Sequence, residues 1–266
     1  MEMKHLKILV CIKQVNDSAD TLQINESTGW IDYSRFTVFR MNRFDEFALE
    51  EALLARERIP GTTVHALSVG PMRVSSTIRR ALEMGADHGI HLLNPGENYI
   101  SPFTVASLIA SYARGKGYDL ILTGVMAEDD MACQVGQFVA AFLDVPCATS
   151  VISEEIHPES SEILVEREIE GGCRQSLLLL LPAVLTIQSG INLPRYPSLT
   201  HVLRARSQPQ EIILSGDLRI SPEREVMEHV RYPEFTSKGI FIEGSPQEKA
   251  RTMLAILHEK SLLLQR

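Results

Sequence analysis

Short apolar runs alternate with stretches of helical periodicity through the first half of this 266-residue chain. The apolar runs predict strands at residues 8–13, 64–69, 88–93 and 118–123. The stretches between them predict helices, with the clearest over 42–58 and others over 72–84 and 101–112. A strand–helix alternation of this kind predicts an α/β fold with a doubly wound, mostly parallel, Rossmann-like sheet.

The pattern changes after Pro146. Three further strands are predicted at 149–156, 163–169 and 174–181, with a hairpin turn at 170–172, and they indicate an antiparallel addition to the sheet. The apolar run that ends at residue 187 is too short to span a membrane, which takes about 20 residues, so we interpret it as two buried strands separated by Pro182.

Prolines recur from Pro194 onward, and a last helix is predicted over 246–264. This composition predicts two parts, a nucleotide-binding α/β domain over 1–193 and a loop and extended C-terminal arm over 194–266. An arm with so little core of its own is expected to lie on a partner subunit.

Composition excludes several function classes. The net charge of −8 argues against a nucleic-acid partner, and the absence of a leading signal favours the cytoplasm. No nucleophile elbow or recognisable histidine pairing indicates an enzyme. Four scattered cysteines without a Cys-x-x-Cys pair indicate no metal site, and we expect buried thiols at Cys11, Cys133, Cys147 and Cys173.

Residues 123–137 connect the fourth predicted strand to an apolar helical segment through a glycine and an acidic turn. In a parallel sheet, ligands bind at such a junction. Amides at a helix N-terminus attract phosphate, and the carboxylates of Asp129 and Asp130 can accept hydrogen bonds from ribose. The stretch predicts a nucleotide site, although both aspartates would equally serve as helix caps.

Six blocks, in this order, resemble the beta subunit of electron transfer flavoproteins: residues 8–15, 41–52, 80–91, 166–172, 181–186 and 194–199. The resemblance implies a non-enzymatic electron carrier that pairs with an alpha subunit, which holds most of the redox FAD. It further implies electron transfer from acyl-CoA dehydrogenases of fatty acid oxidation to a quinone reductase. The beta subunit of such a pair holds AMP or, in electron-bifurcating members that oxidise NADH, a second FAD. A nucleotide sensor with the same fold is a third hypothesis.

The resemblance also implies site residues. The nucleotide-binding positions would be Cys11, Asn42, Arg43, Phe44, Asp45, Val69, Gly124, Val125, Met126, Ala127, Asp129, Asp130, Met131, Ala132, Cys133, Gln134 and Val135. Leu199 would anchor a docking dehydrogenase, with Arg195 and Tyr196 beside it.

Some positions depart from the family pattern. Arg43 replaces a common proline, and Val125, Met126 and Met131 replace polar residues. Bifurcating members often carry glycine at the position of Asp130 and proline at that of Gln137. Since neither is present, the loop resembles the AMP type more closely.

Overall fold

The computed structural model describes residues 5–17, 19, 22–96, 99–233 and 239–260. The chain divides into two compact units, Met1–His229 and Val230–Arg266, which are taken separately here.

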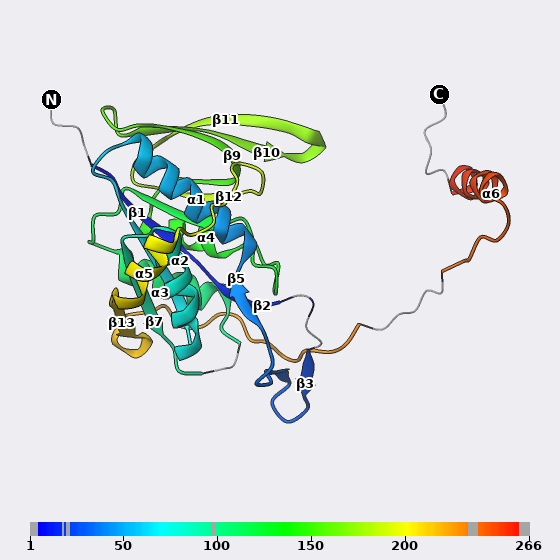
Figure 1. The fold of residues 1–266 in the computed structure, drawn as a ribbon, viewed down its shortest axis with the longest axis horizontal. Helices are drawn as coiled ribbons and strands as arrows, with labels where there is room; N and C mark the ends of the chain where they lie inside the picture. Colours follow the sequence, from blue (N-terminus) through cyan, green and yellow to red (C-terminus); the bar gives the residue numbers. More distant parts are fainter. Residues whose placement is uncertain (1–4, 18, 20–21, 97–98, 234–238, 261–266) are drawn as a thin grey trace. The chain divides into compact units, whose positions relative to one another are not determined.

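The first unit is built on one nine-stranded sheet with the order β11-β10-β9-β12-β8-β1-β6-β7-β13 (Figure 1). Its parallel part consists of β1 (Lys7–Cys11), β6 (Thr63–Gly70), β7 (His88–Leu93), β8 (Leu120–Gly124), β12 (Ala183–Ile187) and β13 (Gln210–Leu214). The antiparallel addition consists of β9 (Cys147–His157), β10 (Glu162–Ile169) and β11 (Cys173–Leu180). Strand β9 joins the parallel part by pairing in parallel with β12. Strand β10 pairs antiparallel with both β9 and β11. The predicted α/β class is confirmed.

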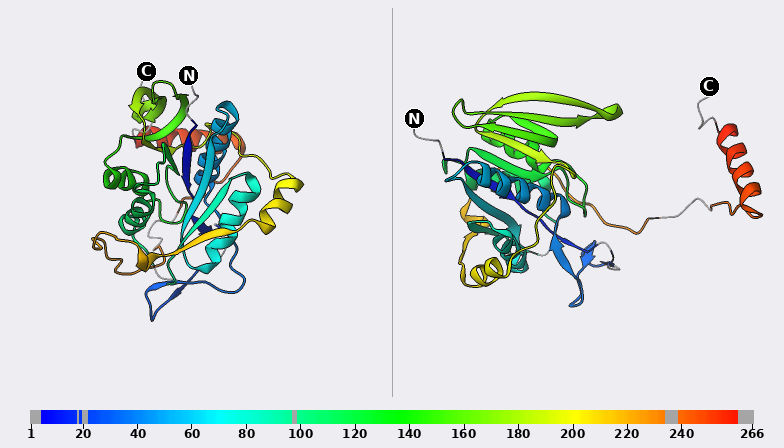
Figure 2. Two further views of the ribbon diagram at one scale, coloured as in Figure 1. Left: turned by 90° about the vertical axis from the view of Figure 1, so that its left-hand side faces the viewer. Right: turned by 45° about the horizontal axis from the view of Figure 1, so that its top comes forward.

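Helices cover both faces of the parallel strands. Figure 2 shows the green helices α3 (Pro102–Ala113) and α4 (Val135–Leu143) on one side, and α1 (Arg43–Arg58) and α2 (Ser75–Met84) on the other. A 3₁₀ turn, η1 (Met72–Val74), precedes α2 and takes up the start of the helix predicted over 72–84.

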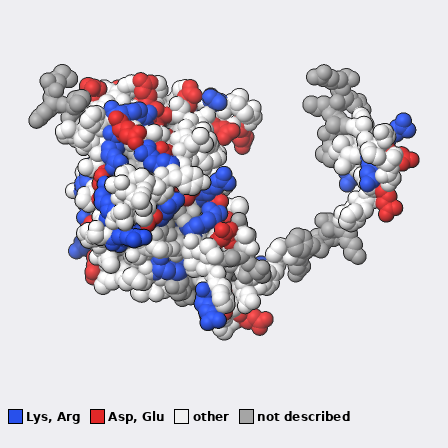
Figure 3. Space-filling view, in the orientation of Figure 1, with Lys and Arg blue, Asp and Glu red and all other residues white. Residues whose placement is uncertain are grey.

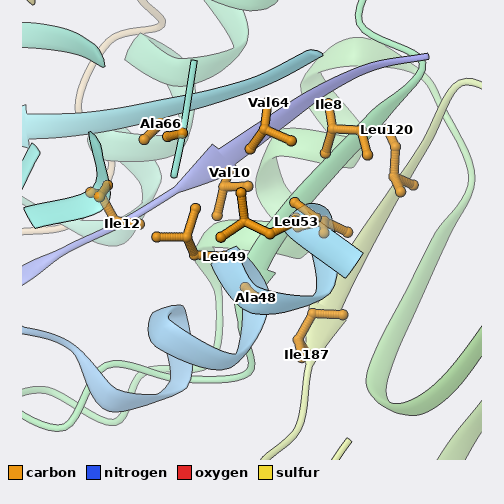
Figure 4. Close-up of a cluster of buried hydrophobic side chains, with 14 of the residues drawn as sticks. Ile8, Val10, Ile12, Ala48, Leu49, Leu53, Val64, Ala66, Leu120 and Ile187 are labelled. Atoms are coloured by element: carbon orange, nitrogen blue, oxygen red, sulfur yellow. The ribbon is translucent and has the colours of Figure 1, made fainter. Parts of the chain in front are cut away.

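Strand β1 is buried on both faces, which explains its apolar sequence. Its residues Ile8 and Val10 belong to the cluster beneath α1, whereas Leu9 and Cys11 belong to the cluster beneath α3 and α4. Figure 4 shows Val10 near Leu49 of α1, and Ile8 farther along the strand beside Leu120. Because both faces are buried, apolar and polar residues do not alternate along the strand.

Two small antiparallel pairs fill the region between β1 and α1. The strands β2 (Gln14–Asn16) and β5 (Phe39–Met41) form one pair, and β3 (Gln23–Asn25) and β4 (Trp30–Asp32) form the other. The β3–β4 pair is an antiparallel hairpin that precedes α1 in the chain.

The structure continues the first unit beyond residue 193, where the sequence suggested that the arm begins. Helix α5 (Leu199–Ser207) packs on α2 and buries Ala205 completely, and β13 pairs in parallel with β7. A 3₁₀ turn, η3 (Ser215–Asp217), follows. Strand β13 was missed because its partner strand lies far away along the chain.

Of the two strands around Pro182 that were expected to be buried, only the second is buried. Strand β12 is buried at every residue, but β11 is the sheet edge and leaves Leu178 59% and Leu180 63% exposed. The turn before it contains η2 (Glu170–Gly172), as predicted for a hairpin.

The second unit contains helix α6 (Pro246–Glu259). Ser245 and Glu248 form a capping box at its start, with the Ser245 side chain accepting from the Glu248 amide. None of its described residues is buried, as expected of a segment without its own core. Residues 261–264 of the predicted helix lie outside the described residues.

Candidate functional site

A pocket of about 210 Å³ opens at the carboxyl ends of β1, β6 and β8. Most of the residues predicted to bind a nucleotide line it: Cys11, Asn42, Asp45, Val69, Gly124, Val125, Met126, Ala127, Asp129, Asp130, Ala132, Cys133, Gln134 and Val135. Three predicted residues, Arg43, Phe44 and Met131, do not line it. We call the segment from Val125 to Gln134 the nucleotide loop.

Asp45, in the first turn of α1, fixes the strand ends that form the floor of the pocket. Its Oδ2 accepts from the Lys13 amide at 2.7 Å, and its Oδ1 accepts from the Gly124 amide at 3.0 Å. Burial raises the pKa of Asp45 to about 7, against the opposing effect of these amide donors. The carboxylate therefore ties β1 and β8 to the start of α1.

Asn42 connects the same helix start to the nucleotide loop. Its Nδ2 donates to the Met126 carbonyl at 2.9 Å, and its Oδ1 accepts from the Glu128 amide at 3.1 Å. Asn42 occupies the N-cap position of α1, but its side chain makes no capping bond. The Glu128 carboxylate instead accepts from the Arg43 amide and pairs with Arg40 at 2.8 Å.

Lys13 is a pocket residue that sequence reasoning missed. Its Nζ lies 2.7 Å from Asp129 Oδ1 and 2.9 Å from Asp130 Oδ2, so one cation bridges both carboxylates of the nucleotide loop. Burial would lower the pKa of Lys13, but the two carboxylates outweigh it and raise the pKa. Asp129 and Asp130 thus serve neither as simple helix caps nor as uncompensated acids.

Two glycines are fixed by close packing. A Cβ at Gly124 would lie 2.5 Å from Asp45 Oδ1 and 2.6 Å from Phe44 Cβ. A Cβ at Gly136 would lie 2.5 Å from Thr186 Cγ2, so Gly136 permits α4 to pack on β12.

The nucleotide loop enters α4 through a constrained backbone. Met131 and Cys133 have φ of 51° and 55°, in the left-handed region that few side chains adopt. Gln134 precedes α4 and makes no side-chain capping bond to the first amides of that helix. Cys133 and Cys173 are exposed, which corrects the expectation of four buried thiols.

A second wall of the pocket comes from residues that no local pattern singled out. Trp30, Ile31 and Tyr33 approach it from the β3–β4 hairpin, and Arg73 approaches from η1. We call these four residues the hairpin wall. Its members meet only in the folded chain, so the sequence carried no signal for it.

The predicted docking loop, residues 194–199, lies against α1. The Arg195 guanidinium contacts Glu50, whose side chain is 4% exposed, at 2.8 Å and Glu57 at 2.6 Å. These carboxylates raise the pKa of Arg195. Arg195 therefore holds the loop to its own domain, whereas Tyr196 is 92% and Leu199 74% exposed.

On the first unit, the face shown in Figure 3 carries many lysine and arginine side chains with acidic side chains among them. Arg79 and Arg80 lie on α2, and Arg204 and Arg206 occupy the last turn of α5. Leu199 is the first residue of the same helix α5 that ends in Arg204 and Arg206.

A doubly wound sheet with a pocket at its strand ends is the arrangement in which open α/β proteins bind their ligands. The profile of the electron transfer flavoprotein domain matches residues 34–213, a span that includes α5 and β13. Across the residues that the structure describes, no helix is both long and apolar enough to cross a membrane.

Individual relatives agree with that match. The chain is 38% identical to electron transfer flavoprotein subunit beta of Bos taurus over 82% of this chain and 85% of the relative. It is 31% identical to the subunit of the same name from Methylophilus methylotrophus, over 96% and 98% of the two chains. Identity to the Bacillus subtilis subunit is 29%, over 97% of this chain and 100% of the relative. The chain therefore belongs to the electron transfer flavoprotein beta-subunit family.

Proposed function

We propose that this chain is the beta subunit of a heterodimeric electron carrier. In this proposal it pairs with an alpha subunit, encloses part of that subunit's FAD and retains AMP in the pocket at the ends of β1, β6 and β8. The pair takes electrons from acyl-CoA dehydrogenases and passes them to a quinone reductase. The FAD supplies the one chemical capacity of the complex, reversible electron transfer, and this chain supplies position and docking.

The observation that carries the proposal is the fixed pocket of a flavoprotein-family chain. The buried Asp45 holds two strand ends, and Asn42 holds the nucleotide loop by both atoms of its amide. A site that is rigid before a ligand arrives loses little entropy on binding.

The pocket residues fit an adenylate. The uncapped start of α4 offers amides to a phosphate, and the polar loop carries acceptors for ribose hydroxyls. Apolar side chains of Val69, Val105 and Ile109 line the same pocket and suit the faces of a purine. These features support AMP without excluding a longer ligand.

Docking is proposed at Leu199. A leucine that is exposed on a loop held by Arg195 offers apolar area at small entropic cost. Tyr196 adds a second exposed side chain, whereas Arg195 acts through the loop it holds.

The deciding experiment is to purify the chain with its partner, extract the bound nucleotides and identify them by mass. One FAD and one AMP per heterodimer are expected. Two FAD per heterodimer, with bleaching by NADH, would establish the electron-bifurcating alternative. A complex without flavin absorbance would leave only the nucleotide sensor.

Asp129→Ala tests the loop within that experiment. The change removes one of the two carboxylates that hold Lys13, so we expect AMP content to fall while FAD content is retained. Glu155→Ala, on the exposed surface of β9, is the matched control. Full AMP retention in Asp129→Ala would disprove the assignment of the loop.

A further inference from the structure

Two histidine side chains meet toward the amino ends of β6 and β7, away from the pocket at the carboxyl ends. His65 of β6 and His88, the first residue of β7, are partners in the parallel register of these neighbouring strands, so their side chains lie on the same face of the sheet. Their ring centroids are 4.6 Å apart, and the rings are inclined by 64°. Neither histidine lines the nucleotide pocket, so the pair is a separate feature of the molecule.

The spacing of the two rings matches that of two imidazoles bound to one metal ion. With metal–nitrogen bonds of about 2.0–2.1 Å and nitrogens about 90–110° apart around the ion, the two ring centres would be about 4.5–5.2 Å apart. The observed separation of 4.6 Å falls within that interval. Packing of aromatic rings alone permits about 4.5–7 Å, so the spacing allows an ion and the free nitrogens decide between the two.

Both rings keep a nitrogen that can bind a metal. His65 Nδ1 lies 3.0 Å from Tyr118 Oη, which leaves His65 Nε2 without a hydrogen-bond partner among the described residues. The same part of the chain offers no hydrogen-bond partner to either nitrogen of His88. When Nε2 of His65 binds a metal, Nδ1 carries the proton and donates to Tyr118 Oη. An outer hydrogen bond of this kind orients most histidines that ligate metals.

The charges around the pair are compatible with a cation. Burial, followed by the effects of His88 and Lys7, lowers the pKa of His65 to about 4, so its imidazole is neutral at pH 7, the form that binds a metal. Lys7 is the cation that opposes a bound metal, and its Nζ donates to the Lys116 carbonyl at 2.9 Å. Asp87 acts in the opposite direction on His65.

We infer that His65 and His88 form a binding site for a divalent transition-metal ion, with Tyr118 as the positioning residue behind His65. Among the described residues, no three histidine, cysteine, aspartate or glutamate side chains are grouped to hold a metal, so water fills the remaining coordination positions. Two imidazoles with water oxygens favour Cu²⁺, which leads the affinity order of the divalent metals and accepts tetragonal coordination by nitrogen and oxygen. Zn²⁺ sites in proteins have three or four protein ligands, so Zn²⁺ should bind here more weakly.

Titration of the untagged full-length chain with Cu²⁺ tests the site by calorimetry and electron paramagnetic resonance. Cys133 and Cys173 are first replaced by serine, because exposed thiols bind and reduce Cu²⁺. This parent chain should bind one Cu²⁺ with hyperfine splitting from two imidazole nitrogens. Ni²⁺ and Zn²⁺ should bind more weakly than Cu²⁺, and Mg²⁺ should not compete, because it prefers oxygen ligands.

Three variants in the parent chain separate ligand from positioning residue. His88→Gln replaces an exposed ligand, so Cu²⁺ affinity should fall by at least about tenfold and the spectrum should show one imidazole nitrogen. Tyr118→Phe keeps both ligands but removes the outer hydrogen bond, so affinity should fall by about 10–100-fold while two nitrogens remain in the spectrum. His229→Gln, at an exposed histidine outside the pair, is the matched control and should bind Cu²⁺ as the parent does.

A parent chain that binds no Cu²⁺ at micromolar concentrations would overturn the site. A parent spectrum with a single imidazole nitrogen would also overturn it, because the ion would then not lie between the two rings. Unchanged affinity and two nitrogens in His88→Gln would place the ion at other residues, with the same consequence. Unchanged affinity in Tyr118→Phe would remove Tyr118 from its positioning role.

Discussion

The nucleotide loop and the docking loop are anchored to the same helix, yet they present opposite surfaces. Asp45 of α1 holds the strand ends under the nucleotide loop, and Glu50, in the next turns of α1, holds Arg195 of the docking loop. The nucleotide loop turns its polar side chains toward a pocket, with Lys13 bridging Asp129 and Asp130. The docking loop turns Tyr196 and Leu199 to solvent.

The difference shows how one helix holds one loop over a pocket and leaves the side chains of another loop exposed. A pocket for a small ligand needs polar groups that are oriented from several directions. Its loop is accordingly held by Asn42 near its start and by Lys13 at Asp129 and Asp130. A docking surface needs one apolar side chain displayed, so a single buried ion pair behind the loop suffices. The two α1 carboxylates that hold these loops, Asp45 and Glu50, are both buried. Removing a partner of either one would leave a buried charge uncompensated and destabilise the fold.

Arg195→Ala should have the largest effect on this comparison. Removing the guanidinium leaves Glu50 buried without its partner, so we expect a loss of about 3 kcal/mol in the free energy of unfolding. Urea denaturation measures it. Arg204→Ala, an exposed arginine of α5, should change it by less than about 0.5 kcal/mol. Equal stability of the two variants would show that the docking loop is not anchored as described.

Gly124→Ala should damage the anchor of the nucleotide loop. The added Cβ would lie 2.5 Å from Asp45 Oδ1, so α1 and β8 must separate, at a cost of about 1–3 kcal/mol. Urea denaturation and AMP content should both report the loss. A Cβ at Gly216 meets no atom within 4 Å, so Gly216→Ala is the control, and matching behaviour of the two variants would refute the close packing.

Glu154→Gln tests a third anchor of α1 through its pH dependence. Glu154 of β9 contacts Arg58, and burial together with the neighbouring Glu51 raises its pKa to about 8. Because the folded pKa lies above the unfolded value near 4.5, the stability contributed by protonated Glu154 is complete below about pH 4.5 and is lost as pH rises through 8.

Glutamine imitates the protonated acid, so Glu154→Gln should melt a few degrees higher than wild type at pH 9 and similarly at pH 5, at roughly 2–4 °C per kcal/mol. Thermal melts across that range measure the difference. Exposed Glu155→Gln should follow the wild-type curve. If the melting temperatures of Glu154→Gln and wild type changed in parallel with pH, Glu154 would not titrate in this range.

Leu199→Ala should affect stability least of all, by less than about 0.5 kcal/mol, because its side chain is exposed. If Leu199 fills a partner's pocket, reduction by the dehydrogenase should slow by about tenfold or more at limiting protein concentration. Stopped-flow reduction of the heterodimer measures this rate. Val226→Ala, at another exposed apolar position, is the control, and an unchanged rate for Leu199→Ala would remove the docking assignment.

Sequence patterns predicted what is local in this fold. The parallel strands, the helices between them and most of the nucleotide loop follow from short apolar runs and the turn after β8. Contacts between distant segments were beyond such patterns. The pairing of β13 with β7, the bridge from Lys13 to Asp129 and the pair of Arg195 with Glu50 each join residues more than 100 positions apart. The hairpin wall was missed for the same reason.

The late position of β13 also has a consequence for synthesis of the chain. Strand β7 emerges early, but the strand that covers its edge is among the last elements of the first unit to be made. Until then, the growing chain carries an unpaired parallel edge, the kind of surface at which nascent chains pair with one another. A ribosome that stalls before residue 210 would therefore leave a nearly complete sheet with β7 as a second open edge in addition to β11, and such products should be strong clients of chaperones.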